Sequence, residues 1–240
     1  MQAPAAEQGR LLHLAEIDVA VAQARHRRAN LPELAQLREL GAQRNAVTAE
    51  LVAAETALSD ATDEQQRLHT DMEPARARLE RNQAKVDAGE ISNPKALNSM
   101  LEELDHLKGR IAKLEDDELE LMQKVEDARK HRDEVAARRG EIDQVARGLL
   151  GARDKAFAEL DAQVEAELTQ RAAVVAKLPA DLVALYEKIA AKSVSGAAQL
   201  ADGRCEGCHV QANAADLRRY QAAARDEVVR CEECGRILIR

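Results

Sequence analysis

The sequence predicts a mainly α protein, with a long antiparallel coiled-coil hairpin followed by a small C-terminal β zinc ribbon. Three observations predict this fold class. Aromatic residues are almost absent, apolar residues recur every seven positions over much of the chain, and all four cysteines fall in the last 36 residues. The first two observations concern the helical part of the chain, and the third concerns its C-terminal end.

The composition is that of long helices. The chain has no Trp, one Phe (Phe157) and two Tyr (Tyr186 and Tyr220), so a large globular core would lack its usual bulky members. Hydrophobic residues still make up 45% and charged residues 32%, which together with an abundance of Ala, Leu, Glu and Arg is typical of coiled coils. We therefore expect one long helical part and one small part that is stabilised by a bound metal ion.

The second half of the predicted hairpin carries a heptad repeat. One apolar row consists of Met100, Leu107, Leu114, Leu121, Ala128, Val135, Ile142, Leu149 and Ala156. A companion row begins Leu97, Leu104, Ile111 and is mixed from Glu118 onward. In the first half, the rows include Leu37, Leu51, Leu58, Met72, Leu79 and Val86, and Leu40, Val47, Ala54, Ala61, Leu68 and Ala75. Such rows predict left-handed coiled-coil packing.

A turn separates the two rows. Gly89 permits the reversal, Asn93 suits an N-cap and Pro94 suits the first helical position. An antiparallel hairpin with its tip near residue 90 would place residues whose numbers sum to about 183 opposite one another. Pro32 then falls opposite flexible residues near Gly148, where we expect both helices to bend.

These patterns divide the chain into two predicted domains. Residues 1–178 form the hairpin, with its tip near 87–94. Residues 179–240 form a short helix, from Asp181 to about Lys192, and a ribbon whose metal ligands lie within 205–234. Strands are expected at 200–204, 228–230 and 237–239, with a helix or ordered loop at 214–224.

The cysteines form two C-x-x-C pairs, Cys205 with Cys208 and Cys231 with Cys234. Two such turns can close a tetrahedral site of four thiolates, which is a donor set that Zn²⁺ favours. The gap between the pairs is a few residues longer than usual, but no cysteine is left over. The sequence therefore predicts one structural Zn²⁺.

Other interpretations of the cysteines fit less well. Cys205 to His209 matches the C-x-x-C-H haem attachment pattern, but haem would leave the second pair without a role. A redox dithiol lacks the βαβ context of thioredoxin-like proteins. A catalytic zinc keeps an open position, which four thiolates would close. His209 could replace Cys208 as a ligand, although a surface role is favoured.

The chain offers no other catalytic grouping. The five histidines of the helical part do not come together at metal-ligand spacing, and no Ser-His-Asp set or phosphate-binding glycine loop is present. A coiled coil also has no cavity that could exclude water from a reaction. We therefore expect no enzyme activity and no small-molecule substrate.

The ribbon residues resemble a known bacterial family. The segments Gly203-Arg204-Cys205-Glu206-Gly207-Cys208-His209 and Val229-Arg230-Cys231-Glu232-Glu233-Cys234-Gly235-Arg236-Ile237-Leu238 are similar to those of C4-type zinc-ribbon proteins with an N-terminal coiled-coil hairpin, a domain of unknown function. The resemblance implies the four ligands and their basic neighbours. Relatives include flagellar regulators and type III secretion-associated proteins, described as contacting an alternative sigma factor and in one case RNA. Glu232 stands where relatives often have Pro.

Charge bears on the class of partner. The net charge is −8, so the whole molecule is not attracted to nucleic acid by bulk electrostatics. From residue 194 onward, seven arginines are balanced by seven acidic residues. The arginines that could gather on one face to bind a partner or nucleic acid are Arg218, Arg219, Arg225, Arg230, Arg236 and Arg240. Tyr220 is the one residue of the ribbon that could stack on a base.

The predicted hairpin tip is acidic. Asp87 and Glu90 lie beside Ile91 at the end of the coiled coil. Acidic coiled-coil tips occur in transcription factors that enter the secondary channel of RNA polymerase, which is an analogy of architecture. The plainer interpretation is that both carboxylates are simply solvated.

Two functions remain open from the sequence. The first is a non-enzymatic adaptor or regulator whose ribbon docks on a protein partner. The alternative is a nucleic-acid-binding regulator that acts through the ribbon arginines. The apolar runs near the N-terminus are interrupted by charges, and no segment is apolar enough for a membrane. Free thiols fit a reducing compartment, so we expect a cytoplasmic protein.

Overall fold

The computed structural model describes all residues from Met1 to Arg240. The chain separates into two compact units. One is Gln36–Gly148, and the other combines Met1–Ala35 with Leu149–Arg240. The boundary predicted at residue 178 follows the patterns in the sequence. In the folded chain, the first helix belongs to the same compact unit as the C-terminal residues.

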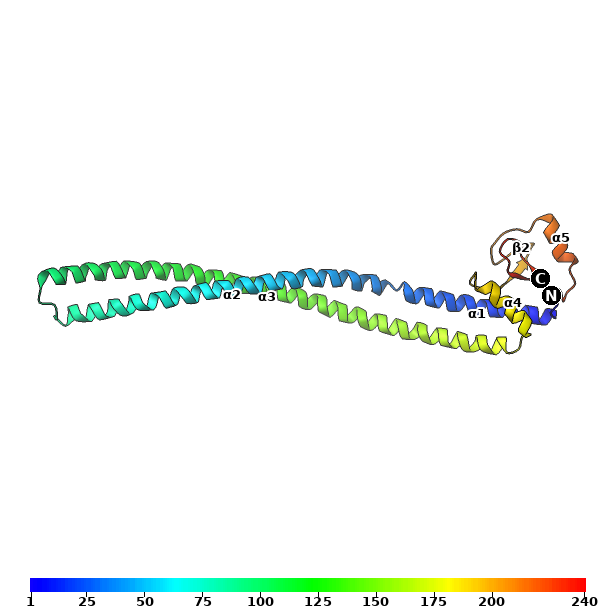
Figure 1. Ribbon diagram of the computed structural model, residues 1–240, viewed down its shortest axis with the longest axis horizontal. Coiled ribbons are helices and arrows are strands. Elements are labelled where there is room, and N and C mark those ends of the chain that lie inside the picture. The colour runs from blue at the N-terminus through cyan, green and yellow to red at the C-terminus, as the bar shows by residue number, and fades with distance from the viewer. The chain divides into compact units, whose positions relative to one another are not determined.

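The unit Gln36–Gly148 is an antiparallel helical hairpin (Figure 1). Its helices belong to α2 (Pro32–Asp87) and α3 (Pro94–Val175). At the tip, Gly89 has φ +68°, a left-handed conformation that glycine adopts without steric cost. Asn93 Oδ1 accepts a hydrogen bond from the N–H of Lys95 at 2.9 Å, so it caps α3 as expected. The hairpin and the coiled-coil fold class are thus confirmed.

The buried side chains of this unit follow the predicted heptad rows. The buried residues of α2 are Leu51, Ala54, Met72 and Ala75, and those of α3 are Leu104, Leu107, Ile111, Leu121, Val125 and Val135. All of them occupy row positions. Burial stops after Val135 in α3, where the companion row becomes charged. The seam is therefore built from two apolar rows that the spacing in the sequence already defines.

Ion pairs between the helices report their register. Arg44 Nε lies 2.6 Å from Asp143 Oδ1, and Arg76 Nη2 lies 2.9 Å from Glu115 Oε1. The residue numbers in these pairs sum to 187 and 191, against the 183 expected for backbone positions. Another pair, Arg78 with Glu103, sums to 181, so the ion pairs fall on both sides of the predicted register, within the reach of long side chains.

The first helix ends where the sequence places a proline. α1 (Ala5–Ala29) stops before Asn30 and Leu31, and α2 begins at Pro32. The expectation of a bend near Pro32 becomes a complete interruption, because Pro32 lacks an N–H and disfavours helical geometry at Leu31. Asn30 Nδ2 donates to the His26 carbonyl at 2.9 Å and so covers one free group at the end of α1.

The C-terminal residues form a small mixed sheet. Its strands are β1 (Ala197–Ala201), β2 (Arg204–Cys205), β3 (Val229–Arg230) and β4 (Ile237–Ile239), in the order β2-β1-β4-β3. β1 and β4 are parallel, and the other two pairings are antiparallel. The short helix α5 (Ala214–Ala222) lies between β2 and β3 in sequence. The predicted ribbon is present, with a parallel pair at its centre.

The ribbon shares its core with two helices. α4 (Ala180–Ala190) and α1 pack against β1 and β4, and both chain termini lie at this end of the unit (Figure 1). The fully buried members of the shared core are Leu11, Leu14, Leu182, Tyr186 and Ile237. The extreme N-terminus joins the sheet region as well, since Ala3 N–H donates to the Asp226 carbonyl at 2.7 Å. Helix and ribbon therefore fold as one body.

A part-buried polar network ties the helices of this unit together. Arg171 of α3 donates through Nε to Asp18 Oδ1 of α1 at 2.6 Å, and through Nη2 to Glu187 of α4 at 2.6 Å. The Tyr186 hydroxyl donates to Asp18 Oδ2 at 2.7 Å. Burial, followed by the nearby Asp18 carboxylate, raises the pKa of Tyr186 well above its usual value. The network fixes α1, α3 and α4 in one arrangement.

The helices are long but polar along their length. None contains a stretch apolar enough to cross a bilayer.

Candidate metal centre

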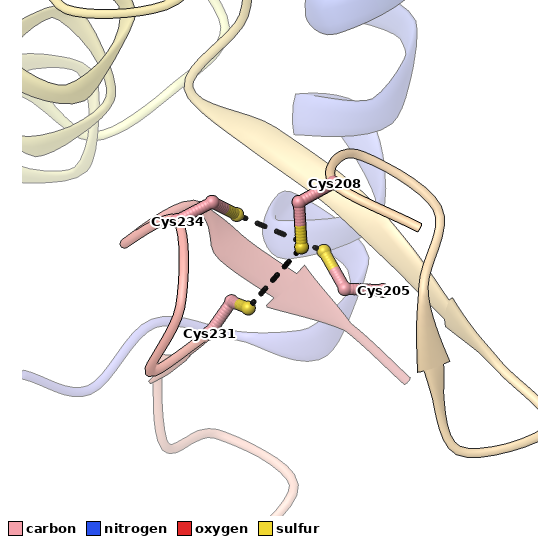
Figure 2. A group of neighbouring side chains, drawn as sticks. All are labelled: Cys205, Cys208, Cys231 and Cys234. Carbon is pink, nitrogen blue, oxygen red and sulfur yellow. Dashed lines mark hydrogen bonds between the residues drawn. The ribbon is translucent and has the colours of Figure 1, made fainter. Parts of the chain in front are cut away.

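The four cysteines converge from two turns of the ribbon. Cys205 ends β2 and Cys231 follows β3 directly, while Cys208 and Cys234 lie on the turns beyond them (Figure 2). Cys205 and Cys231 are buried, and the other two are half-buried. The sheet brings the turns together because β1 lies between β2 and β4, and β4 pairs with β3. The pairing of strands thus assembles a cluster from residues 23 or more positions apart.

The spacing of the sulfur atoms matches a tetrahedral metal site. Sγ of Cys205 lies 3.9 Å from Sγ of Cys234, and Sγ of Cys208 lies 3.8 Å from Sγ of Cys231. All four sulfurs lie within 4.8 Å of one another. A Zn–S distance of about 2.3 Å in a tetrahedron requires sulfurs about 3.8 Å apart. A disulfide requires about 2.05 Å, so these sulfurs are placed as metal ligands are and not as bonded pairs.

Both turns have the same backbone design. The N–H of His209 donates to the Cys205 carbonyl at 2.7 Å, and the N–H of Gly235 donates to the Cys231 carbonyl at 2.9 Å. His209 and Gly235 both have left-handed backbones, with φ of 59° and 74°. Each residue therefore closes its turn one position after the second cysteine. At Gly235 this costs nothing, whereas at His209 it stores strain.

The thiols differ in their readiness to ionise. Burial raises the pKa of Cys205 to about 12 and also raises the pKa of Cys231. Burial opposes ionisation of Cys234 too, but hydrogen bonds from the Arg236 N–H, the neighbouring thiols and the Arg236 side chain lower its pKa to about 7. Because a metal binds thiolates, loading this site at neutral pH must release protons from the buried pair.

Arg236 supports the first turn from the second. Its Nη1 donates to the Gly207 carbonyl at 2.9 Å, and its Nε donates to the Ser195 carbonyl at 3.1 Å. A Cβ on Gly207 would lie 2.7 Å from Cδ of Arg236 and 2.8 Å from Cβ of Ala198. The first turn therefore fits against β1 and Arg236 only with glycine at position 207.

His209 points away from the cluster. Its side chain is 62% exposed, and Nδ1 lies 3.8 Å from a Glu206 carboxylate oxygen. The side chains whose donor atoms come close enough to hold a metal ion are the four cysteines, without a histidine. This agrees with the surface role favoured for His209 over exchange with Cys208.

Contacts within the ribbon hold most of the predicted arginines. Arg219 pairs with Glu232 and, at 3.4 Å, with Asp216. The other arginines of the set bind backbone carbonyls: Arg218 that of Ala214, Arg230 that of Gly235, and Arg236 those of Ser195 and Gly207. Arg225 is exposed and lines a hollow beside α1 and α5. Arg240 donates to four carbonyls between residues 220 and 227.

Tyr220 and the hairpin tip also have defined environments. Tyr220 is only 2% exposed, and its hydroxyl accepts from the Glu232 N–H at 3.4 Å, so its ring braces the second turn and cannot stack on a base. At the tip, Asp87 accepts from Gln83 Nε2 at 2.8 Å, and Glu90 is exposed. Nothing else in the tip converges with these two carboxylates.

Sequence reasoning missed the supporting residues of the site. No sequence pattern indicates the roles of Gly207, Ser195 and Tyr220, because each role depends on a contact between residues that are far apart in sequence. The one usable indication was the Cys234-Gly235-Arg236 sequence, which places a cation directly after the last thiol.

Two protein-family models match the chain. Residues 14–194 match the CT398-like coiled coil hairpin domain, and residues 204–238 match the C4-type zinc ribbon domain. The first model alone covers more than half of the sequence.

Relatives agree over the full length. The chain is 32% identical to the uncharacterised protein Rv2229c of Mycobacterium tuberculosis, covering 100% of this chain and 98% of that protein. A solved structure from Mycobacterium smegmatis has a TM-score of 0.88 at 35% identity and covers both chains completely. CT398 of Chlamydia trachomatis has a TM-score of 0.66 at 14% identity, covering 97% of this chain and 96% of that one, which shows the shared fold.

The hairpin match, the ribbon match and the full-length relatives all describe one architecture, and the four clustered thiols form a candidate metal site within the matched ribbon. The chain belongs to the family of CT398-like coiled-coil hairpin proteins that end in a C4-type zinc ribbon.

Proposed function

We propose that this protein is a non-enzymatic adaptor, in which one structural Zn²⁺ held by Cys205, Cys208, Cys231 and Cys234 stabilises a ribbon that docks on protein partners. The observation that carries the metal assignment is the sulfur spacing of 3.8–3.9 Å. Four thiolates fill the coordination sphere, so the ion would hold the two turns together and leave no position for a substrate. In this proposal, each predicted domain has its own role: residues 1–178 form the coiled coil, and residues 179–240 dock on the partner.

The preference for a protein partner rests on the arginines. Ion pairs and carbonyl contacts hold most of them within the ribbon, and the molecule carries a net charge of −8. Tyr220 is buried, which removes the one candidate for base stacking. A nucleic-acid complex would have to draw on exposed side chains such as Arg218 and Arg225, whose attraction for phosphates the surrounding acidic residues weaken. We extend the proposal to a cytoplasmic partner in transcription or secretion, in line with the family resemblance.

Metal content is tested first on the intact chain. Protein purified in metal-free buffer and denatured should release one Zn²⁺ per chain to a chromophoric chelator. The Cys231→Ser/Cys234→Ser variant should release none. An intact ribbon without bound metal, or full occupancy in the variant, would contradict the ligand assignment.

The class of partner is tested by crosslinked recovery of the intact protein from cytosol, with and without nuclease. Protein partners that survive nuclease and disappear with Cys231→Ser/Cys234→Ser support the adaptor. Recovery of mainly nucleic acid, lost on Arg218→Glu/Arg219→Glu and weakened steeply by salt, would replace it with the nucleic-acid regulator. The hairpin tip is tested alongside with Asp87→Lys/Glu90→Lys, which should leave ribbon-dependent partners bound.

A further inference from the structure

A groove runs along α1 beside the first cysteine turn. It consists of two adjoining hollows, of about 810 and 640 Å³, that share His26 and Arg27. Val19, Ala22 and Val194 form the apolar floor of the first hollow, and Leu160 contributes to the second. We call this surface the α1 groove. Val194 is 53% exposed there, so the groove presents apolar side chains that the protein itself leaves uncovered.

The α1 groove carries unneutralised positive charge. Arg27 Nη2 donates to the neutral Gln163 Oε1 at 2.9 Å, and Arg236 donates to two backbone carbonyls. Neither guanidinium forms an ion pair with a carboxylate. The Cys234 thiolate would offset part of the positive charge of Arg236, to which it is hydrogen-bonded. Glu159 is the one acidic residue of the lining. In a molecule of net charge −8, such a locally basic apolar groove favours an acidic occupant.

The same chain exposes a surface of the complementary kind. Leu119 and Met122 are 65% and 50% exposed, and they lie one turn apart on the outer face of α3. Acidic residues lie within a turn on both sides, including Asp116 before them and Glu126 after them. We call residues 115–126 of this face the α3 patch. The other exposed large apolar residues of the hairpin unit, such as Val52, Leu101 and Val145, lie apart from it in sequence, and none has a second exposed large apolar residue one turn away.

We propose that the protein self-associates, with the α3 patch of one copy seated in the α1 groove of a second copy. An amphipathic helix laid in an apolar groove buries its paired anchors, here Leu119 and Met122, against the groove floor. The acidic neighbours of these anchors then face Arg27 at the rim, which sets the orientation of the helix. This inference does not depend on the metal or on the class of partner proposed above.

The contact joins two different surfaces, which limits how it can assemble. If the second copy also seats its α3 patch in the α1 groove of the first, the two copies form a closed dimer. If it binds a third copy instead, the contact repeats in an open chain. Two apolar anchors place the interface at the small end of the range, below about 1,200 Å², where association is weak. The mass of the protein in solution should therefore rise with concentration.

Sedimentation of the metal-loaded, full-length protein from about 1 to 200 µM tests the proposal. The wild type should shift from monomer toward a larger species. Leu119→Ser/Met122→Ser should raise the dissociation constant at least about tenfold, whereas Val52→Ser, which removes a lone exposed apolar residue elsewhere, should leave it within about twofold. Arg27→Glu should weaken association, and Arg25→Glu, on the same helix outside the groove lining, should not. Circular dichroism and thermal melting of each variant verify that it is folded.

Mixing gives the decisive result. The Arg27→Glu protein keeps an intact α3 patch, and the Leu119→Ser/Met122→Ser protein keeps an intact α1 groove, so the two should associate with each other more tightly than either does with itself. A mass that stays monomeric at every concentration would overturn the proposal. So would a mixture that fails to associate, because the two surfaces would then not be partners. Association that is lost in Arg27→Glu but kept in Leu119→Ser/Met122→Ser would assign the groove to a different occupant and equally refute the pairing.

Discussion

Substitution of Gly207 by alanine should weaken zinc binding without touching a ligand. The added Cβ would lie 2.7 Å from Cδ of Arg236 and 2.8 Å from Cβ of Ala198, where ordinary carbon contacts are about 3.5–4.0 Å. Arg236 cannot swing aside freely, because its guanidinium donates to the carbonyls of Ser195 and Gly207. Ala198 is buried in β1, next to β4. The first cysteine turn must therefore move away from the sheet.

The magnitude follows from the cost of inserting one methyl group into a packed site, about 1–3 kcal/mol. Since folding of a small metal module is coupled to binding of the metal, this cost appears in the affinity. At about 1.4 kcal/mol per factor of ten, the dissociation constant for Zn²⁺ should rise roughly 5- to 150-fold. Competition against a chromophoric chelator, performed on the full-length chain, measures the change directly.

A matched glycine provides the control. A Cβ on Gly9, in α1, would meet nothing within 4 Å, so Gly9→Ala should leave zinc affinity within about twofold of wild type. Combining Gly207→Ala with Arg236→Ala removes one of the two clashes, and its effect should be smaller than the sum of the two single changes. Wild-type affinity in Gly207→Ala would refute the contact-based reasoning, as would strict additivity in the double variant.

Three further outcomes are expected. His209→Gly relieves a left-handed backbone at an exposed side chain and should raise stability by about 0.5–1 kcal/mol in urea titrations; a loss of stability would show that the His209 side chain contributes more than strain costs. Tyr186→Phe removes a hydrogen bond to a carboxylate and should cost about 1.5–3 kcal/mol, an effect that Asp18→Asn should reduce in a double-mutant cycle; independent effects would disprove the coupling. The side-chain hydrogen bond from Arg44 lowers the pKa of Asp143, so the stabilisation is present above the unfolded value of about 3.9 and is lost as pH falls through the lower folded value. The difference in melting temperature between wild type and Asp143→Asn should accordingly shrink in acid, and a difference that is constant with pH would contradict this.

Much of the helical fold could be predicted because it depends on local order along the chain. A seven-residue apolar spacing places Leu107, Leu121 and Val135 on one stripe, whatever lies far away in sequence. The turn at Gly89 and the cap at Asn93 are equally local. Two C-x-x-C pairs define a donor set by residue type alone, which is why a four-thiolate metal centre can be predicted from the sequence.

Other features could not be predicted because they join distant residues by contacts that no spacing encodes. The contacts of the arginines are the clearest case, since Arg219 meets Glu232 and Arg236 meets Ser195 only after the sheet has formed. The bend expected at Pro32 became a break, although proline at that place was evident.

The sequence by itself determined that this protein is a coiled-coil hairpin with a four-thiol metal module, because heptad spacing and ligand type are properties of short segments. Only the tertiary structure decided that α1 and α4 complete the core of the ribbon, that Asp18 joins Arg171 and Tyr186, and that Gly207 and Arg236 support the cysteine turns. The physical reason is that close packing and the pairing of buried polar groups depend on which surfaces meet, and that choice belongs to the folded chain as a whole.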